Sequence, residues 1–146
     1  GGSKTLFRLG GPDSLRMCVT EAAIDAMSLA AFEGLRDGSL YLSTGGGWSP
    51  LTDAALRVLA GRPGAMMVAA TDANDQGETF AERLRVLAEN AGCGWQRLRP
   101  AADDWNEALQ EKVKVEKEKR EEWKKGRPAA CASPASREAS PGRAGP

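Results

Sequence analysis

Histidine is absent from all 146 residues. Its absence excludes Ser-His-Asp and Cys-His catalysis, histidine general bases and most catalytic zinc sites. Cysteine is scarce too, because Cys18, Cys93 and Cys131 lie far apart and outside any CxxC spacing. We therefore expect ordinary thiols in a reducing compartment, the cytoplasm. No apolar run approaches the roughly eighteen residues of a membrane-spanning helix, so we expect neither a signal peptide nor a membrane partner.

The net charge of zero conceals an uneven distribution along the chain. Residues 1–110 contain ten Lys and Arg against fourteen Asp and Glu, a net charge of −4. Residues 111–146 contain ten Lys and Arg against six Glu, a net charge of +4. An acidic globular part does not attract a polyanion by itself. Binding of nucleic acid would therefore need metal ions, the basic tail or another domain.

Short apolar runs alternate with helical periods along most of the chain. We predict strands at residues 16–20, 40–43, 65–70 and 95–98, and helices at residues 21–35, 49–60, 78–91 and 103–125. In the first helix Ile24, Met27, Ala31 and Leu35 share one face, which we expect to be buried. The alternating order predicts an α/β, Rossmann-like fold, a four-stranded parallel sheet with helices on both faces.

The composition divides the chain into regions. Residues 16–110 form the predicted α/β domain, and residues 1–15 precede it. Residues 111–126 are predicted to form a charged, exposed helix, since the apolar face disappears beyond Leu109. Residues 127–146, rich in Ala, Pro, Gly and Ser, are predicted to be a disordered tail. The start without Met suggests a piece of a longer polypeptide.

Acidic and glycine residues follow three predicted strands at their carboxyl ends. Glu21 follows the first strand, Thr44–Gly47 follow the second and Asp72–Gly77 follow the third. In a parallel sheet these ends border the crevice in which ligands bind. Clustered carboxylates raise one another's pKa unless a cation neutralises them, and Mg²⁺ accepts one or two carboxylates with water and phosphate oxygens.

The glycines of these loops allow a second interpretation. Gly45, Gly46, Gly47 and Gly77 would let backbone N–H groups approach a phosphate. Asp and Gly are also common in ordinary strand-to-helix loops, where Asp caps the helix and Gly turns the chain. Charge and spacing alone do not decide between a ligand site and simple loop chemistry.

Four segments resemble the motifs of the toprim family in order and spacing. Val19–Leu29 resembles the strand ending in Glu that is followed by a helix with Asp-Ala-x-Ser. Tyr41–Gly47 resembles the glycine-bearing second strand end, and Val68–Glu78 resembles the Asp-x-Asp-x-x-Gly motif. Asp103–Leu109 resembles the Asp-Trp-Asn segment that closes many primase-like toprim domains. Over residues 16–109 the chain is thus similar to toprim domains of plasmid and mobile-element primases and relaxase-associated proteins.

This resemblance implies nucleotidyl transfer or strand cleavage on nucleic acid with Mg²⁺ or Mn²⁺. It implies that Glu21 is the general acid or base and Asp72 the first metal ligand. Asn74 stands where the second Asp of the motif belongs, and Asp75 follows one place later. An Asn carbonyl can bind Mg²⁺ but brings no negative charge, and Asp75 would replace it as a metal ligand if the turn shifts by one place. Asp25, one turn after Glu21, would support Glu21 or a metal-bound water, or would simply be a polar residue favoured by the helix dipole.

The resemblance also implies partners. These are nucleic acid (DNA is expected), nucleotides and other domains of a larger parent protein, with residues 1–15 as the tail of a preceding region. A catalytically degenerate toprim module that binds nucleic acid or proteins is the alternative. A phosphoacceptor receiver domain ranks last, because the final strand ends in Arg97-Leu-Arg99 without the required Lys.

Other polar and aromatic residues have more modest expected roles. Asp103 and Asp104 are expected to cap a helix rather than bind metal. Trp95 and Trp105 are expected to cover the sheet, whereas Trp48, beside the triple glycine, is the better candidate for contact with a substrate.

Overall fold

The computed structural model describes residues 6–126. The elements, in chain order, are β1 (Phe7–Gly10), β2 (Arg16–Thr20), α1 (Ala23–Glu33), β3 (Ser39–Ser43), α2 (Pro50–Ala60), β4 (Met66–Ala69), α3 (Asp75–Ala91), β5 (Gly94–Arg97) and α4 (Trp105–Gly126). The chain divides into two compact units, residues 1–111 and residues 112–146, and each is described by itself.

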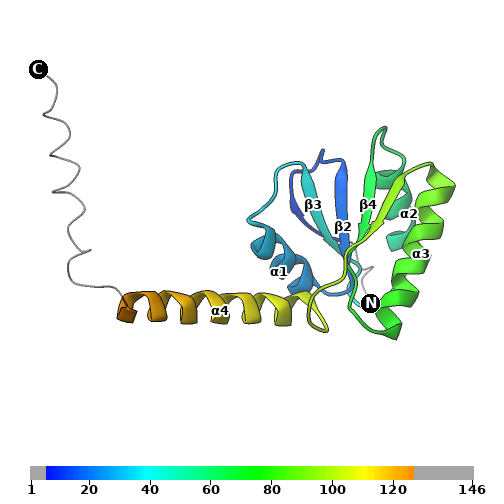
Figure 1. The fold of residues 1–146 in the computed structure, drawn as a ribbon. Coiled ribbons are helices and arrows are strands. Elements are labelled where there is room, and N and C mark those ends of the chain that lie inside the picture. Colours follow the sequence, from blue (N-terminus) through cyan, green and yellow to red (C-terminus); the bar gives the residue numbers. More distant parts are fainter. Residues whose placement is uncertain (1–5, 127–146) are drawn as a thin grey trace, which may run out of the picture. The chain divides into compact units, whose positions relative to one another are not determined.

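The strands of the first unit form one sheet in the order β1-β3-β2-β4-β5. β2 pairs in parallel with β3 and β4, and β4 pairs in parallel with β5. Figure 1 shows α1 on one face of the sheet and α2 with α3 on the other. The predicted α/β fold class, with four parallel strands and helices on both faces, is confirmed.

A fifth strand extends the sheet beyond the prediction. β1 pairs antiparallel with β3, with Phe7 opposite Ser43 and Gly10 opposite Leu40. These residues were predicted to precede the domain, because a strand of four residues is too short for its alternation to stand out from a loop. Gly10 allows the strands to approach, since its φ is 116° and a Cβ there would lie 2.5 Å from the Ser39 carbonyl oxygen.

Two hydrophobic layers cover the sheet. The layer beneath α2 and α3 includes Leu56, Leu59, Leu84 and Leu87. The layer beneath α1 and the beginning of α4 includes Leu29, Tyr41, Val68 and Trp105. Cys18 belongs to this second layer, and burial raises the pKa of its thiol to about 12. The thiol is therefore neutral near pH 7, as expected for an ordinary core cysteine.

The buried face of α1 differs from the predicted one. Ile24, Met27 and Leu35 are among the exposed large hydrophobic residues. The residues that α1 buries are mostly small or polar: Asp25, Ala26, Ser28, Leu29 and Ala30. The predicted face was wrong because α1 turns its small side chains toward the sheet, and the spacing of the large apolar residues does not reveal this. Asp25 lies on the side of α1 that faces the sheet and is therefore buried.

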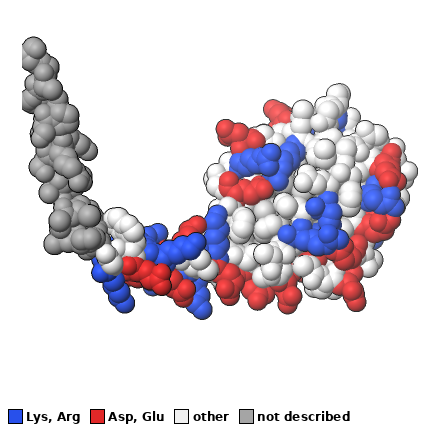
Figure 2. Space-filling model, viewed as in Figure 1, with Lys and Arg blue, Asp and Glu red and all other residues white. Residues whose placement is uncertain are grey.

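α4 begins in the first unit and continues into the second. Trp105 and Ala108 are buried, whereas every residue from Gln110 to Gly126 is exposed. The predicted charged and exposed helix is therefore present. Lys, Arg, Asp and Glu side chains lie intermixed on the face of the molecule shown in Figure 2. The tail predicted to be disordered, residues 127–146 with Cys131, lies outside the described residues.

Candidate functional site

The candidate site lies at the carboxyl edge of the parallel strands. β2 is followed by Glu21, β3 by the loop Thr44–Gly47, and β4 by Thr71 and Asp72. Because β2 lies between β3 and β4, the three loops meet at the same edge of the sheet. Gly46 N donates to the Glu21 carbonyl oxygen at 2.6 Å, which ties the second loop to the first.

Glu21 and Asp72 are in direct contact there. The Asp72 backbone N–H donates to Glu21 Oε2 at 3.2 Å, across 51 positions of sequence. Glu21 is only 7% exposed. Burial, followed by the Glu21 charge, raises the pKa of Asp72 to about 6. The two carboxyl groups therefore form an electrostatically strained pair.

One oxygen of Asp72 has no partner. Among the described residues Asp72 Oδ1 is buried and makes no hydrogen bond, and the same holds for Thr44 Oγ1, which follows β3 at the same edge. Buried polar atoms are almost always satisfied, so an unpaired carboxylate oxygen calls for a water or a cation. A divalent cation would satisfy this oxygen and relieve the repulsion between Asp72 and Glu21.

Two further carboxylates act on this pair from nearby. Asp25 is 5% exposed, and its Oδ1 accepts from Asn106 N at 3.2 Å. Burial is the largest cause that raises the pKa of Asp25, and the Asp104 and Asp72 charges add to it. Asp104 Oδ1 accepts from Glu107 N at 2.8 Å, so the predicted capping of α4 by Asp104 is confirmed. The beginning of α4 thus contacts Asp25 beside the site.

Asn74 and Asp75 are placed differently from the motif's expectation. Asn74 is the N-cap of α3, and its Oδ1 accepts from Gly77 N at 2.8 Å. Its side-chain oxygen is therefore engaged by its own helix. Asp75 is the first residue of α3 and is exposed. Within residues 6–126 no three acidic or thiol side chains converge on one point where a metal could bind.

The glycine loop after β3 is closed by its own hydrogen bonds. Gly45 N donates to Ser43 Oγ at 3.1 Å, and Gly46 N donates to Glu21 O. Gly45 and Gly46 have φ values of 75° and 85°, which favour glycine. Gly47 is exposed beside them. Of the four glycine N–H groups predicted to contact a phosphate, the two of Gly45 and Gly46 are thus already used to position this loop.

Gly77 has a packing function that the sequence analysis did not foresee. A Cβ at this position would lie 1.8 Å from the Asp72 carbonyl oxygen. Thr71 Oγ1 donates to the Gly77 carbonyl oxygen at 2.6 Å, which holds the first turn of α3 against the end of β4. The Gly77 N–H donates to Asn74 Oδ1 and is therefore not available to a phosphate. Gly77 is therefore needed to place Asp72.

Arg97 is the main residue that sequence reasoning missed. Its side chain is 7% exposed, and Nη1 donates to the carbonyl oxygens of Ala69 at 2.9 Å and Thr71 at 3.0 Å. Nη2 donates to the Asp72 carbonyl oxygen at 2.9 Å. Arg97 thereby fixes the backbone on both sides of the β4 end. Its position at the carboxyl end of the last strand was the available signal.

A family model described as Toprim-like matches residues 18–109, well over half of the chain. The chain belongs to the Toprim-like family. Toprim-like domains generally bind divalent metal ions and have functions related to nucleic acid. No curated protein and no solved structure matches this chain. The matched segment of the Toprim-like domain runs from β2 into the first turns of α4, and so contains every candidate site residue.

The donor set of this Toprim-like domain fits Mg²⁺ better than other common metals. Mg²⁺ takes oxygen ligands, commonly one or two carboxylates completed by water and substrate phosphate. Glu21 and Asp72 provide two neighbouring carboxylates, and Asp72 Oδ1 is unpaired within the described structure. Zinc or iron sites would instead require His or Cys groups, which do not gather at this edge. The carboxylate pair therefore suits a hydrated Mg²⁺ or Mn²⁺ ion.

The tryptophans of the Toprim-like domain serve mainly structural purposes. Trp105 Nε1 donates to the Ala70 carbonyl oxygen at 2.9 Å, and its ring packs edge-on against Phe32. Trp48 Nε1 donates to Asp53 Oδ1 at 2.9 Å, and the Arg83 guanidinium lies 4.2 Å from the centre of its ring. One face of Trp48 is thus already covered, so substrate stacking there would require Arg83 to move.

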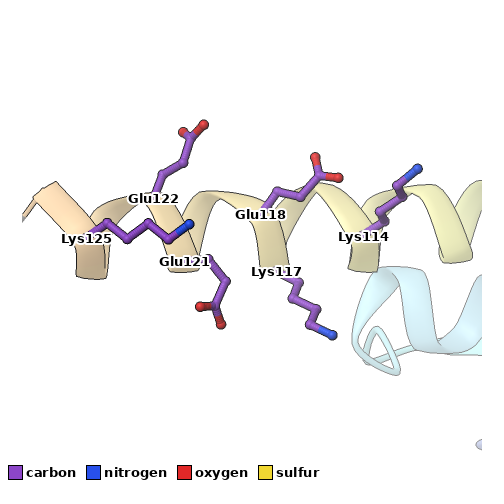
Figure 3. Close-up of a pocket in the computed structure, with 6 residues that line it drawn as sticks. All are labelled: Lys114, Lys117, Glu118, Glu121, Glu122 and Lys125. Carbon is purple, nitrogen blue, oxygen red and sulfur yellow. The ribbon is translucent and has the colours of Figure 1, made fainter.

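A hollow on the surface of α4 does not contribute to the site. A shallow hollow along α4 is bordered by alternating basic and acidic side chains of that one helix (Figure 3): Lys114, Lys117, Glu118, Glu121, Glu122 and Lys125. These side chains project from a solvated helix and do not converge on a ligand position. In the described part of the chain no helix is long and apolar enough to cross a bilayer.

The pKa of Asp72 leads to a prediction about stability. Because folding raises this pKa from 3.8 to about 6, the native state binds the proton more tightly than the unfolded state. Stability is therefore lost as the pH rises through this window. We expect Asp72→Asn, measured in EDTA by urea unfolding, to stabilise the domain by about 1 to 2 kcal/mol near pH 8, after allowance for solvent screening.

The difference should shrink toward zero only at about pH 3 and below, because the unfolded-state pKa is 3.8 and Asp72 is protonated in both states there. Asp37→Asn is the matched control, because Asp37 is exposed and precedes β3 at the opposite edge of the sheet. Equal pH profiles for the two variants would show that ionised Asp72 carries no such strain.

Proposed function

We propose that this Toprim-like domain binds Mg²⁺ or Mn²⁺ and performs nucleotidyl or phosphoryl transfer on nucleic acid within a primase-type or mobilisation protein. The observation that carries the proposal is the buried Glu21–Asp72 pair with its unpaired Asp72 oxygen. Without a cation, this arrangement leaves two carboxyl groups in contact and one polar atom unsatisfied. A function that uses a divalent ion accounts for both features.

Each residue of the pair has a distinct proposed role. Asp72 is the metal ligand, because its unpaired Oδ1 lies just beyond the carboxyl end of the interior strand β4. Glu21 is the general acid or base, oriented by the Asp72 N–H that fixes its Oε2. When bound, the ion would neutralise charge on the phosphoryl group undergoing transfer. Asp25 supports the pair from the buried face of α1.

Nucleic acid is the proposed substrate because of the family, and the charge balance makes a bound cation necessary for its approach. Residues 1–110 carry a net charge of −4, so the domain does not attract a polyanion by long-range electrostatics. A bound divalent ion would offset the negative charge of Glu21 and Asp72 at this edge of the sheet, so that a phosphate could approach. Nucleotides, single-stranded DNA and other domains of a parent protein are the proposed partners.

Metal titration is the direct test of the site. Mg²⁺ and Mn²⁺ would be titrated into the full chain by calorimetry and by backbone NMR. We expect binding with shifts at the amides of Glu21 and Asp72, binding that is lost in Asp72→Asn and retained in Asp37→Asn. Failure to bind either ion up to about 10 mM, above the weak end of protein affinities for divalent ions, would contradict the metal site.

A second candidate function is a degenerate Toprim-like module that binds nucleic acid or proteins without catalysis. The observation in its favour is Asn74, whose side chain is used as a helix cap and adds no charge to the site. Asn74→Asp separates the two proposals. If the domain is an enzyme with one weakened ligand, the restored charge should tighten Mn²⁺ binding several-fold; a scaffold gains nothing.

A further inference from the structure

Asp72 is connected to an exposed arginine through two intervening side chains. Arg97 Nη2 donates both to the Asp72 carbonyl oxygen at 2.9 Å and to Glu78 Oε1 at 2.8 Å. Glu78 in turn accepts from Arg99 Nε at 2.7 Å and from Arg99 Nη2 at 2.9 Å. Arg97 and Arg99, two positions apart in the sequence, thus both donate to the Glu78 carboxylate at the edge that carries the candidate site.

The two arginines differ in what holds them. Arg97 is 7% exposed and is anchored by backbone carbonyl oxygens at the end of β4. Arg99 is 59% exposed, and both of its side-chain hydrogen bonds are to Glu78, itself 42% exposed. Arg97 is therefore a fixed part of the domain. Within residues 6–126, Arg99 is held only by an exposed ion pair, which contributes little to stability and weakens with salt.

We propose that Arg99 binds a backbone phosphate of single-stranded nucleic acid, and that Glu78 occupies its guanidinium until the phosphate displaces it. This inference rests on the proposed function, because it supplies the contact that would hold a strand beside Glu21 and Asp72. Glu78 contacts Arg99 through both carboxylate oxygens, the planar two-point geometry with which guanidinium also binds phosphate. The carboxylate therefore marks the position of the ligand.

The location of Arg99 favours a nucleic-acid strand over a free anion. The domain is acidic overall, so a cationic contact at its carboxyl edge is needed to offset repulsion of the phosphates. Arg97 reduces the negative potential from within, since its charge acts on both Glu78 and Asp72. The exposed Arg99 is then the cationic group in this chain of contacts that reaches solvent.

Arg85 offers a comparison on the same helix as Glu78. It is bound by two acidic residues, Glu82 and Glu89, along the exposed side of α3. These three residues form two ion pairs within α3, and neither ion pair involves the end of β4. Glu82→Gln is therefore the matched control for Glu78→Gln, because each removes one negative charge from an arginine partner on α3.

Fluorescence anisotropy with a labelled single-stranded oligo-dT tests the proposal on the full chain in EDTA. We expect Arg99→Gln to weaken binding by about three- to tenfold and to reduce the salt slope by about 0.7, the value for one lost phosphate contact. Glu78→Gln should tighten binding by a similar factor. Arg99→Lys should fall between the wild type and Arg99→Gln, since it keeps the charge and loses the two-point contact.

The double variant Glu78→Gln/Arg99→Gln identifies the pair as the cause, because the gain from Glu78→Gln should vanish without Arg99. Equal tightening by Glu78→Gln and Glu82→Gln would overturn the proposal, as it would reveal a general charge effect. Unchanged binding by Arg99→Gln would overturn it as well, and this variant leaves the buried Arg97–Glu78 contact in place. Inorganic phosphate that competes as well as oligo-dT would indicate a free-anion site instead.

Failure of this inference is distinguishable from failure of the proposed function. Oligo-dT binding is measured without metal, whereas the carboxylate site is measured by Mg²⁺ and Mn²⁺ titration without nucleic acid. Arg99-dependent binding in a protein that takes no metal would support the phosphate contact on a degenerate module. Metal binding with no effect of Arg99→Gln would leave the carboxylate site and refute the contact.

Discussion

Glu21→Gln is expected to reduce nucleotide incorporation on a single-stranded template by at least about 100-fold, within the range of general acid–base contributions. Glutamine keeps the shape of the side chain and can still accept the hydrogen bond from Asp72 N, which stands at 3.2 Å from Glu21 Oε2. It cannot take up or release the proton at neutral pH. The measurement is primer synthesis with Mg²⁺ or Mn²⁺, followed by gel analysis of labelled products.

This prediction has internal controls. Glu89→Gln removes a charge from an exposed position at the far end of α3 and should leave the rate within twofold or so, as usual for surface changes. Metal binding should persist in Glu21→Gln, because Asp72 remains, which separates proton transfer from ligation. Full activity in Glu21→Gln would remove the acid–base role. A wild-type protein that binds nucleic acid and metal yet makes no product would favour the degenerate module.

Gly77→Ala is expected to destabilise the domain by roughly 3 kcal/mol, at the upper end of the cost of overpacking. The added methyl carbon would lie 1.8 Å from the Asp72 carbonyl oxygen, so the backbone of α3 or of the β4 end must move. Such movement also breaks the Thr71–Gly77 hydrogen bond and shifts Asp72. Urea unfolding followed by circular dichroism measures the effect, and complete loss of a cooperative transition would be the same result in a stronger form.

Gly47→Ala is the control for this substitution. Gly47 lies in the glycine loop, yet a Cβ there would meet nothing within 4 Å, and its φ is not in the left-handed region. We expect a change of no more than about 0.5 kcal/mol, typical of tolerant surface positions. A Gly77→Ala variant as stable as Gly47→Ala would show that the first turn of α3 adapts without disturbing Asp72.

Much of the architecture follows from local sequence. The uniformly apolar segment around Met67 and Val68 predicts a strand buried on both faces, and it forms the interior strand β4. Ser49 followed by Pro50 predicts a helix start, and Ser49 Oγ accepts from Thr52 N at 3.1 Å as an N-cap. Where the side chains themselves encode the element, the prediction and the structure agree.

Two local predictions were incomplete for physical reasons. The inward face of α1 follows from the fit of small residues against the sheet, so Ile24 and Met27 stay exposed despite their helical spacing. The edge strand β1 depends on hydrogen bonds to β3, which lies more than 25 positions later in the chain. Neither close packing nor non-local pairing leaves a strong periodic signal.

The sequence by itself determined which chemistry is available to this protein. It holds no histidine, and the four toprim-like segments place acidic residues at the ends of predicted parallel strands. All four segments lie within the family match over residues 18–109. These features depend on residue type and short-range spacing, which the linear chain records directly.

Only the tertiary structure decided which of these residues contact one another and which hydrogen bonds they make. It joined Glu21 to Asp72 across 51 positions, left Asp72 Oδ1 without a partner in the described residues, and assigned Asn74 to the cap of α3. It also brought the buried Arg97 to the Asp72 carbonyl oxygen. Such relations depend on which strands lie side by side and how closely a helix approaches them, because burial and contact between distant segments set both charge balance and hydrogen bonding.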